Sequence, residues 1–112
     1  MEFTKKIPPR IFYPTNDGEP IADHGKIFLE ADEQITFVTK EGEEYDFVAK
    51  DWGFYATPSI NKRLTDEGFR TALVRNSGGK YYVMVVRVQS LGQFHGYLKR
   101  EFCDIIEWLD ER

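Results

Sequence analysis

The sequence predicts an α+β fold: a mostly antiparallel sheet of five or six strands, with one C-terminal amphipathic helix packed on one face. Between residues 26 and 88, short runs of alternating and β-branched residues are separated by glycine-containing turns, which is typical of strands joined in hairpins. Between residues 91 and 110, apolar residues recur at spacings of three and four, the period of a helix with one buried face. Such a helix supplies the cover that a small sheet needs.

The N-terminal segment, residues 1–20, is expected to be the most loosely ordered part of the chain. Its four prolines exclude a helix and interrupt the pairing of a central strand. Residues 11–13 have the composition of a short edge strand, and the Asn-Asp-Gly sequence at residues 16–18 predicts a turn. Because 112 residues are few for two cores, we expect a single domain over residues 1–112.

Two hairpins are predicted in the middle of the chain. In the first, residues 34–40 and 44–50 alternate in side-chain character on either side of a Glu-Gly-Glu turn. In the second, residues 69–75 and 80–88 flank an Asn-Ser-Gly-Gly turn. A short apolar run at residues 26–30 predicts a further strand.

The run at residues 81–86 differs from the other predicted strands. It is apolar at almost every position instead of alternating. Strands of this kind are usually covered on both faces, so we expect this strand to lie in the centre of the sheet.

At the C-terminus we expect one helix over about residues 91–110. Ser90 and Gln93 have the spacing of a capping box at its start. The alternative is a helix that ends near Arg100, followed by a final strand over residues 103–109, because two isoleucines in that segment favour strands. The unbroken apolar stripe favours the single helix.

Composition argues against several classes of protein. The net charge of −4 gives no basic footprint, so duplex nucleic acid is not an expected partner. No apolar run approaches the roughly 18–20 residues that span a bilayer, and the first residues do not resemble a secretory leader. A single cysteine, Cys103, excludes an intramolecular disulfide and is typical of a reducing compartment. We therefore expect a soluble cytoplasmic protein.

No metal site, cofactor or catalytic motif is predicted. The two histidines, His24 and His95, are far apart in the sequence, and no second cysteine is present to complete a set of metal ligands. We expect His95 to be a partly buried, hydrogen-bonded residue of the helix. Cys103 is expected on the exposed side of that helix, where acidic neighbours raise its pKa and make it a poor nucleophile.

Residues 52–63 form the candidate site. Three aromatic rings fall within four positions, and hydroxyls, an amide and two cations follow. Rings stack on a sugar or a base, amides and hydroxyls orient a ligand, and Arg and Lys hold phosphate or carboxylate. The expected ligand-binding residues are Trp52, Tyr55, Thr57, Ser59, Asn61, Lys62, Arg63 and Arg70. The alternative is that the rings close the end of the sheet and the two cations belong to a solvated turn.

Three functions are compatible with these residues. The preferred hypothesis is a binding or accessory module whose loop at residues 52–63 takes a small anionic or sugar-like ligand or a protein partner. A second is an interaction protein that forms a homodimer through a sheet edge or the helix face. A third is a small enzyme that uses Asp51, His24 and His95 as acid–base groups, which requires the three side chains to converge.

Overall fold

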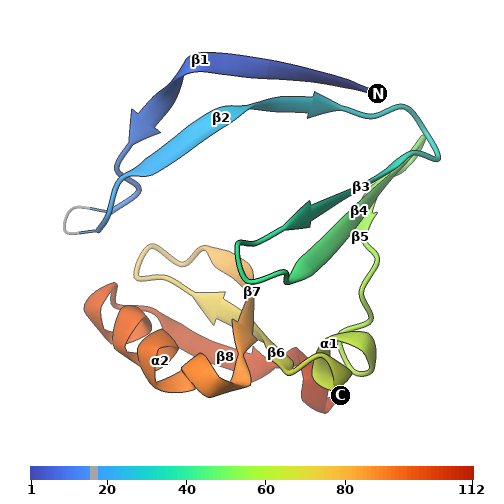
Figure 1. Cartoon of the computed structure of the whole chain (residues 1–112). Coiled ribbons are helices and arrows are strands. Elements are labelled where there is room, and N and C mark those ends of the chain that lie inside the picture. Colours follow the sequence, from blue (N-terminus) through green and yellow to red (C-terminus); the bar gives the residue numbers. More distant parts are fainter. Residues whose placement is uncertain (16–17) are drawn as a thin grey trace. The chain divides into compact units, whose positions relative to one another are not determined.

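The computed structural model describes residues 1–15 and 18–112 and has an α+β architecture (Figure 1). The described residues form eight strands in three antiparallel sheets, with the strand orders β1–β2, β3–β4–β5 and β7–β6–β8. The longest helix, α2 (Leu91–Arg100), lies near the C-terminus. The predicted fold class is confirmed, although the strands are divided among three small sheets. Asn16 and Asp17, in the predicted turn, lie outside the described residues.

The chain divides into two units, Met1–Thr57 and Pro58–Arg112. The first contains the two-stranded ribbon β1–β2 and the sheet β3–β4–β5, and the second contains the sheet β7–β6–β8 with α2. That both units belong to a single domain over residues 1–112 stays a prediction.

The ribbon corrects the expectation of a loosely ordered N-terminus. β1 (Glu2–Phe12) pairs with β2 (Ile21–Phe28) at both of its ends, over residues 2–5 and again over residues 10–12. The register of the pair shifts between Lys5 and Arg10, and Pro8 and Pro9 lie in this irregular stretch. The prolines are tolerated because a bulge needs no ladder hydrogen bond from them.

A glycine allows the two strands of the ribbon to approach closely. Gly25 pairs with Lys5 next to the bulge and has φ of +141°. A Cβ atom at this position would lie 2.1 Å from the carbonyl oxygen of Thr4. Both the backbone angle and the missing side chain are therefore required for pairing here.

The second sheet of the first unit contains the first predicted hairpin. β3 (Gln34–Val38) and β4 (Glu44–Lys50) pair antiparallel, close to their predicted bounds. β5 (Gly53–Ala56) then pairs with β4 after the two-residue link Asp51-Trp52. This third strand lies in the segment to which the sequence analysis assigned no secondary structure.

The sheet of the second unit has β6 (Phe69–Arg75) in its centre, between β7 (Tyr81–Arg87) and β8 (Asp104–Trp108). The predicted central position of residues 81–86 is therefore wrong, because β7 is an edge strand. Its second half is the covered part, with Val86 buried, whereas residues 81–83 are exposed. β7 is therefore apolar at almost every position even though its side chains are not buried on both faces of the sheet.

The core of the second unit lies between its sheet and α2. Ala72 and Val74 of β6 are buried against Leu98 of α2. Partly buried side chains complete this core: Met84, Phe94, Cys103, Ile105 and Trp108. The predicted packing of an amphipathic helix on one sheet face is thus observed within this unit.

The helix is shorter than predicted, and the alternative reading is the one observed. α2 follows a 3₁₀ turn, η1 (Val88–Ser90), and ends at Arg100. Ser90 precedes α2 but makes no side-chain capping bond, so the predicted capping box does not form. The chain then continues into β8, which pairs with β6.

Two further expectations for the C-terminal segment are wrong. His95 is exposed on α2 instead of partly buried. Cys103 lies after the helix and packs against the core. Burial raises the pKa of the Cys103 thiol, and the charges of Glu101 and Asp104 raise it further. The thiol is therefore a weak nucleophile, as expected, but mainly because of burial.

Candidate functional site

The predicted aromatic cluster lies at the tip of the β4–β5 hairpin. Trp52 in the link and Tyr55 in β5 stack with their ring centroids 6.2 Å apart and their planes at 4°. The Trp52 side chain is 70% exposed, and Tyr55 is also exposed. The reading in which these rings close the end of a sheet from inside does not fit this exposure. Each ring uses one face for its neighbour, so the outer faces remain for other contacts.

Thr57 connects β5 to β4. Its Oγ1 donates to Oδ2 of Asp46 at 2.9 Å, and its backbone N–H donates to the Asp46 carbonyl oxygen at 2.9 Å. Asp46 is one of the few buried polar residues, at 7% exposure. The Thr57 hydroxyl therefore satisfies a buried carboxylate, which is a structural role.

The predicted hydroxyl, amide and cations of residues 59–63 surround α1 (Arg63–Asp66), a single helical turn. The Ser59 Oγ accepts the backbone N–H of Arg63 at 2.7 Å. Lys62 Nζ lies 2.8 Å from Oδ2 of Asp66, and Arg63 Nε donates to Oε1 of Glu67 at 3.2 Å. Asn61 is exposed. Both cations are thus already paired with carboxylates four residues further along the chain.

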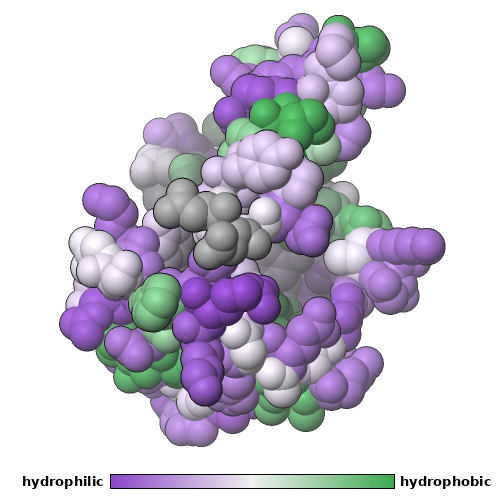
Figure 2. All heavy atoms as spheres, turned by 90° about the vertical axis from the view of Figure 1, so that its left-hand side faces the viewer, coloured by the Kyte–Doolittle hydropathy of each residue, from purple (hydrophilic) through white to green (hydrophobic). Residues whose placement is uncertain are grey.

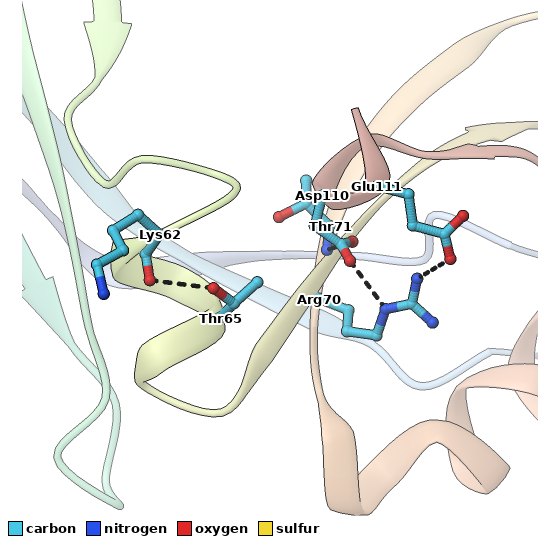
Figure 3. A network of polar contacts seen from close by, with 6 residues as sticks. All are labelled: Lys62, Thr65, Arg70, Thr71, Asp110 and Glu111. Carbon is cyan, nitrogen blue, oxygen red and sulfur yellow. Dashed lines mark hydrogen bonds and ion pairs between the residues drawn. The ribbon is translucent and has the colours of Figure 1, made fainter.

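Arg70 joins β6 to the C-terminal 3₁₀ turn η2 (Leu109–Glu111) (Figure 3). Its Nε donates to Oδ2 of Asp110 at 3.1 Å, and its Nη2 donates to Glu111 at 2.7 Å. The guanidinium also lies over the Trp108 ring, 4.0 Å from the centroid. Burial lowers the pKa of Arg70, but the two carboxylates outweigh it and the net shift is upward.

The network in Figure 3 continues to the backbone of β6. Oδ1 of Asp110 accepts the N–H of Thr71 at 3.1 Å, so one carboxylate bonds both Arg70 and its neighbour. The side chain of Asp110 is 8% exposed. An anionic ligand would have to displace these carboxylates to reach Arg70. Lys62 and Arg63 are more exposed, and surface ion pairs of this kind hold a cation only weakly.

The predicted site residues are divided between the two units. Trp52, Tyr55 and Thr57 belong to the first unit, and Ser59, Asn61, Lys62, Arg63 and Arg70 belong to the second. Within the first unit the structure brings the two rings together. Within the second, Ser59 and Arg63 are in contact, whereas Arg70 belongs to the network at η2.

An apolar face of the β3–β4–β5 sheet is the feature that the sequence analysis missed. The register places seven apolar residues on one face: Ile35, Phe37, Tyr45, Phe47, Ala49, Phe54 and Ala56. The rings of Phe37, Tyr45 and Phe47 form a cluster with centroids 5.3 to 6.1 Å apart. Partial burial raises the pKa of Tyr45. We call these seven residues the aromatic face.

The aromatic face is only partly covered. Phe37 is 52% exposed and Phe54 is 76% exposed. The main contacts of β3, β4 and β5 are with one another. Among described residues, the buried apolar side chains of the core all belong to the second unit: Leu64, Ala72, Val74, Val86 and Leu98. Figure 2 shows apolar side chains at the surface among hydrophilic ones on the face that it draws.

The alternating pattern of residues 34–50 already placed five of the seven residues on common strand faces. What the pattern does not contain is the third strand, which brings Phe54 next to Ala49. No family model matches this chain, and the comparisons with curated proteins and with solved structures found no match.

The residues of the proposed acid–base group lie on three different elements. His24 is on β2, Asp51 is in the β4–β5 link and His95 is on α2, and all three are exposed. In the described part of the chain, no three His, Cys, Asp or Glu residues are grouped so that they could hold a metal ion. No helix among the described residues has the length and apolar character needed to cross a membrane.

Proposed function

We propose that this chain is a binding module whose aromatic face docks a protein partner. The observation that carries the proposal is the exposure of Phe37 and Phe54 on a face made only of apolar residues. Monomeric proteins rarely leave such a face uncovered, and interface centres are enriched in aromatic residues. A flat sheet face suits a protein surface better than a small molecule, which is usually bound in a concave site.

Charge indicates the chemistry of the partner. Residues 1–57 contain 12 acidic and 6 basic side chains, whereas residues 58–112 contain 7 acidic and 9 basic ones. The acidic excess therefore lies in the unit that carries the aromatic face. An apolar patch bordered by Lys and Arg would be complementary to it, and the charge difference would accelerate association at low salt.

A small ligand at Trp52 and Tyr55 is the second candidate. It is favoured by the parallel ring pair, whose outer faces are open to a sugar or a base. An anionic ligand at Arg70 would have to exchange with Asp110 and Glu111, which already bind its guanidinium. The protein partner requires no such exchange.

Two serine substitutions in the same hairpin separate the candidates. Phe54→Ser removes an exposed ring from the aromatic face, and Trp52→Ser removes an exposed ring from the stacked pair. The probe is a phage-displayed library of random peptides, panned against the whole wild-type chain. We expect enrichment of peptides that combine basic and apolar residues. A synthetic consensus peptide is then titrated calorimetrically into all three proteins.

The proposal expects Phe54→Ser to weaken peptide binding by about 10-fold or more, the effect of losing one anchoring ring. Trp52→Ser should change binding by less than about 3-fold, and the dissociation constant should rise with salt. Equal binding to wild type and Phe54→Ser contradicts the proposal. If only Trp52→Ser loses peptide binding, the peptide binds at the stacked rings of Trp52 and Tyr55 and not at the aromatic face.

A further inference from the structure

β7 has the properties of an unprotected sheet edge. It pairs with β6 over seven consecutive residues without a register shift, and within residues 1–15 and 18–112 no strand lies on its other side. Between Lys80 and Arg87 it contains no charged residue, proline or glycine. Its first three residues are exposed, with Val83 at 60%. Strands of this length and composition pair readily with another strand.

The opposite edge of the same sheet is protected in the usual ways. β8 contains two carboxylates, Asp104 and Glu107, and its pairing with β6 shifts register between Leu73 and Val74. Charges and bulges of this kind prevent a second chain from adding to an edge. Since protection is present at β8 and missing at β7, the sheet is open to addition on one side only.

We propose that β7 pairs with β7 of a second copy of this chain. The pairing is antiparallel around Met84, so that each three-stranded sheet becomes half of a continuous six-stranded sheet. In this register Met84 faces Met84 of the other copy, Val83 faces Val85, and Tyr82 faces Val86. Each facing pair joins two apolar side chains, and β-branched or aromatic pairs of this kind stabilise sheets.

The distribution of charge in β7 favours a second copy over a different strand. Its charged neighbours are basic and stand at the two ends, Lys80 before the strand and Arg87 at its last position. Antiparallel pairing places Arg87 opposite Tyr81 and Lys80 opposite Val88, so like charges are kept apart. Pairing in the parallel direction would align Arg87 with Arg87 and would be repulsive.

The pairing also satisfies the backbone groups of the open edge. In antiparallel strands that face each other around a two-fold axis, the same patch contacts itself, which is the commonest arrangement of homodimers. Val83 alternates with the residues whose side chains meet α2, and so lies on the opposite face of the sheet from Met84. Four valines, Val83 and Val85 from each copy, would gather on that face. This inference does not depend on the aromatic face.

The first test is the mass of the whole chain in solution by sedimentation velocity at micromolar concentration. The proposal expects a species of about twice the 13.1 kDa chain mass. Val83→Lys inserts a charge into the middle of the edge and should shift the protein to the monomer. Val38→Lys is the matched control, because Val38 is 57% exposed on β3, an edge strand of the β3–β4–β5 sheet. It should leave the dimer intact.

The register is tested by a paired substitution. Val85→Lys alone should dissociate the dimer as Val83→Lys does, since the two positions face each other. Combining Val83→Lys with Val85→Glu places opposite charges across the interface twice, and should restore the dimer. Circular dichroism of each variant checks that the sheet is retained.

Three outcomes overturn the inference. A monomeric wild-type chain at the highest concentration excludes the dimer outright. A dimer that survives both lysine substitutions, or one that Val38→Lys breaks equally, places the contact elsewhere. Failure of the charge pair to restore the dimer excludes this register.

Discussion

At the scale of single residues, Asp23 shows how one side chain fixes an irregular strand. Its Oδ2 accepts from Lys6 Nζ at 2.7 Å and from Arg10 Nε at 3.3 Å, and its Oδ1 accepts the N–H of Gly25 at 3.1 Å. Lys6 lies in the irregular stretch of β1 and Arg10 at its end. One carboxylate thus joins the irregular part of β1 to the opposite strand.

These contacts make the ribbon sensitive to acid. The hydrogen bond from Lys6 is the largest cause that holds the pKa of Asp23 at about 2, below its usual 3.8. Because the folded pKa is the lower one, the contribution of Asp23 to stability is present above pH 3.8 and is lost as the pH falls towards 2. The chemical shift of the Gly25 amide proton should report this titration, with a midpoint near 2.

Lys6→Gln provides the control for this titration, since it removes the largest cause of the shift. The midpoint should then move up towards the usual pKa of Asp23. Asp23→Asn should abolish the low-pH titration of the Gly25 amide. A wild-type midpoint at 3.8 would show that the ion pair does not form in solution.

The predicted site residues show how far residue types alone can lead. The aromatic content of residues 52–55 left open whether the rings are exposed or close the end of a sheet, and Trp52 is exposed. The ion-pair partners of Arg70 could not be predicted from residue types. The partners of Arg70 lie 40 and 41 positions away in the sequence, so only the folded chain brings them together.

At the scale of elements, the end of α2 explains why one helix was expected where a helix and a strand occur. The apolar residues keep their helical spacing through Phe102 and Ile105, so this spacing does not indicate that the helix ends at Arg100. The helix nevertheless ends in a Schellman motif: Cys103 N–H donates to the Leu98 carbonyl oxygen at 2.9 Å, and Phe102 N–H to that of Lys99 at 3.3 Å. Phe102 takes the left-handed position, with φ of 56°.

Glycine is the residue usually found at this position, and a glycine at residue 102 would have predicted the end of the helix. Phe102→Gly should therefore stabilise the protein by about 0.5 to 1 kcal/mol, because relief of the left-handed strain exceeds the added freedom of the unfolded chain. Little apolar contact is lost, since Phe102 is 78% exposed. The midpoint of urea unfolding measures the change.

Phe102→Ala is the matched variant, since it also removes the ring but keeps the Cβ atom that causes the strain. It should show none of the gain. Equal midpoints for the alanine and glycine variants would mean that the backbone angle at this position costs nothing.

Strand positions were easier to predict than strand neighbours. The alternation of residues 34–50 and the turn at residues 76–79 gave two hairpins close to their observed bounds, because hairpins are local. The pairing of β8 with β6 is not local, since the helix separates them along the chain. The edge position of β7 follows from that pairing and could not be inferred from its composition.

At the scale of the whole molecule, the two units differ in how they are stabilised. The buried apolar core residues of the described chain all belong to the second unit, whereas the first relies on ladder hydrogen bonds and partly exposed rings. Burial of apolar area is the main favourable contribution to folding. The second unit should therefore be the more stable part of the chain.

Native-state hydrogen exchange tests this difference on the whole chain. Amides in the centre of β6 should exchange most slowly, because this strand is paired on both sides and buried. Amides of β1–β2 and β3–β4–β5 should exchange faster, through openings that leave β6 protected. If all strands exchange at one common rate, the chain unfolds as a single cooperative domain, as its length predicts.

The placement of the core also determines the order of events during synthesis. Residues 1–57 leave the ribosome first, and they carry the aromatic face but, among described residues, none of the buried apolar core residues. β6 receives its last partner only when β8 has been translated. The rings of the aromatic face are therefore synthesised before the strands and the helix that form this core. A chaperone or the docking partner itself, if it binds during translation, would meet these rings before any core exists.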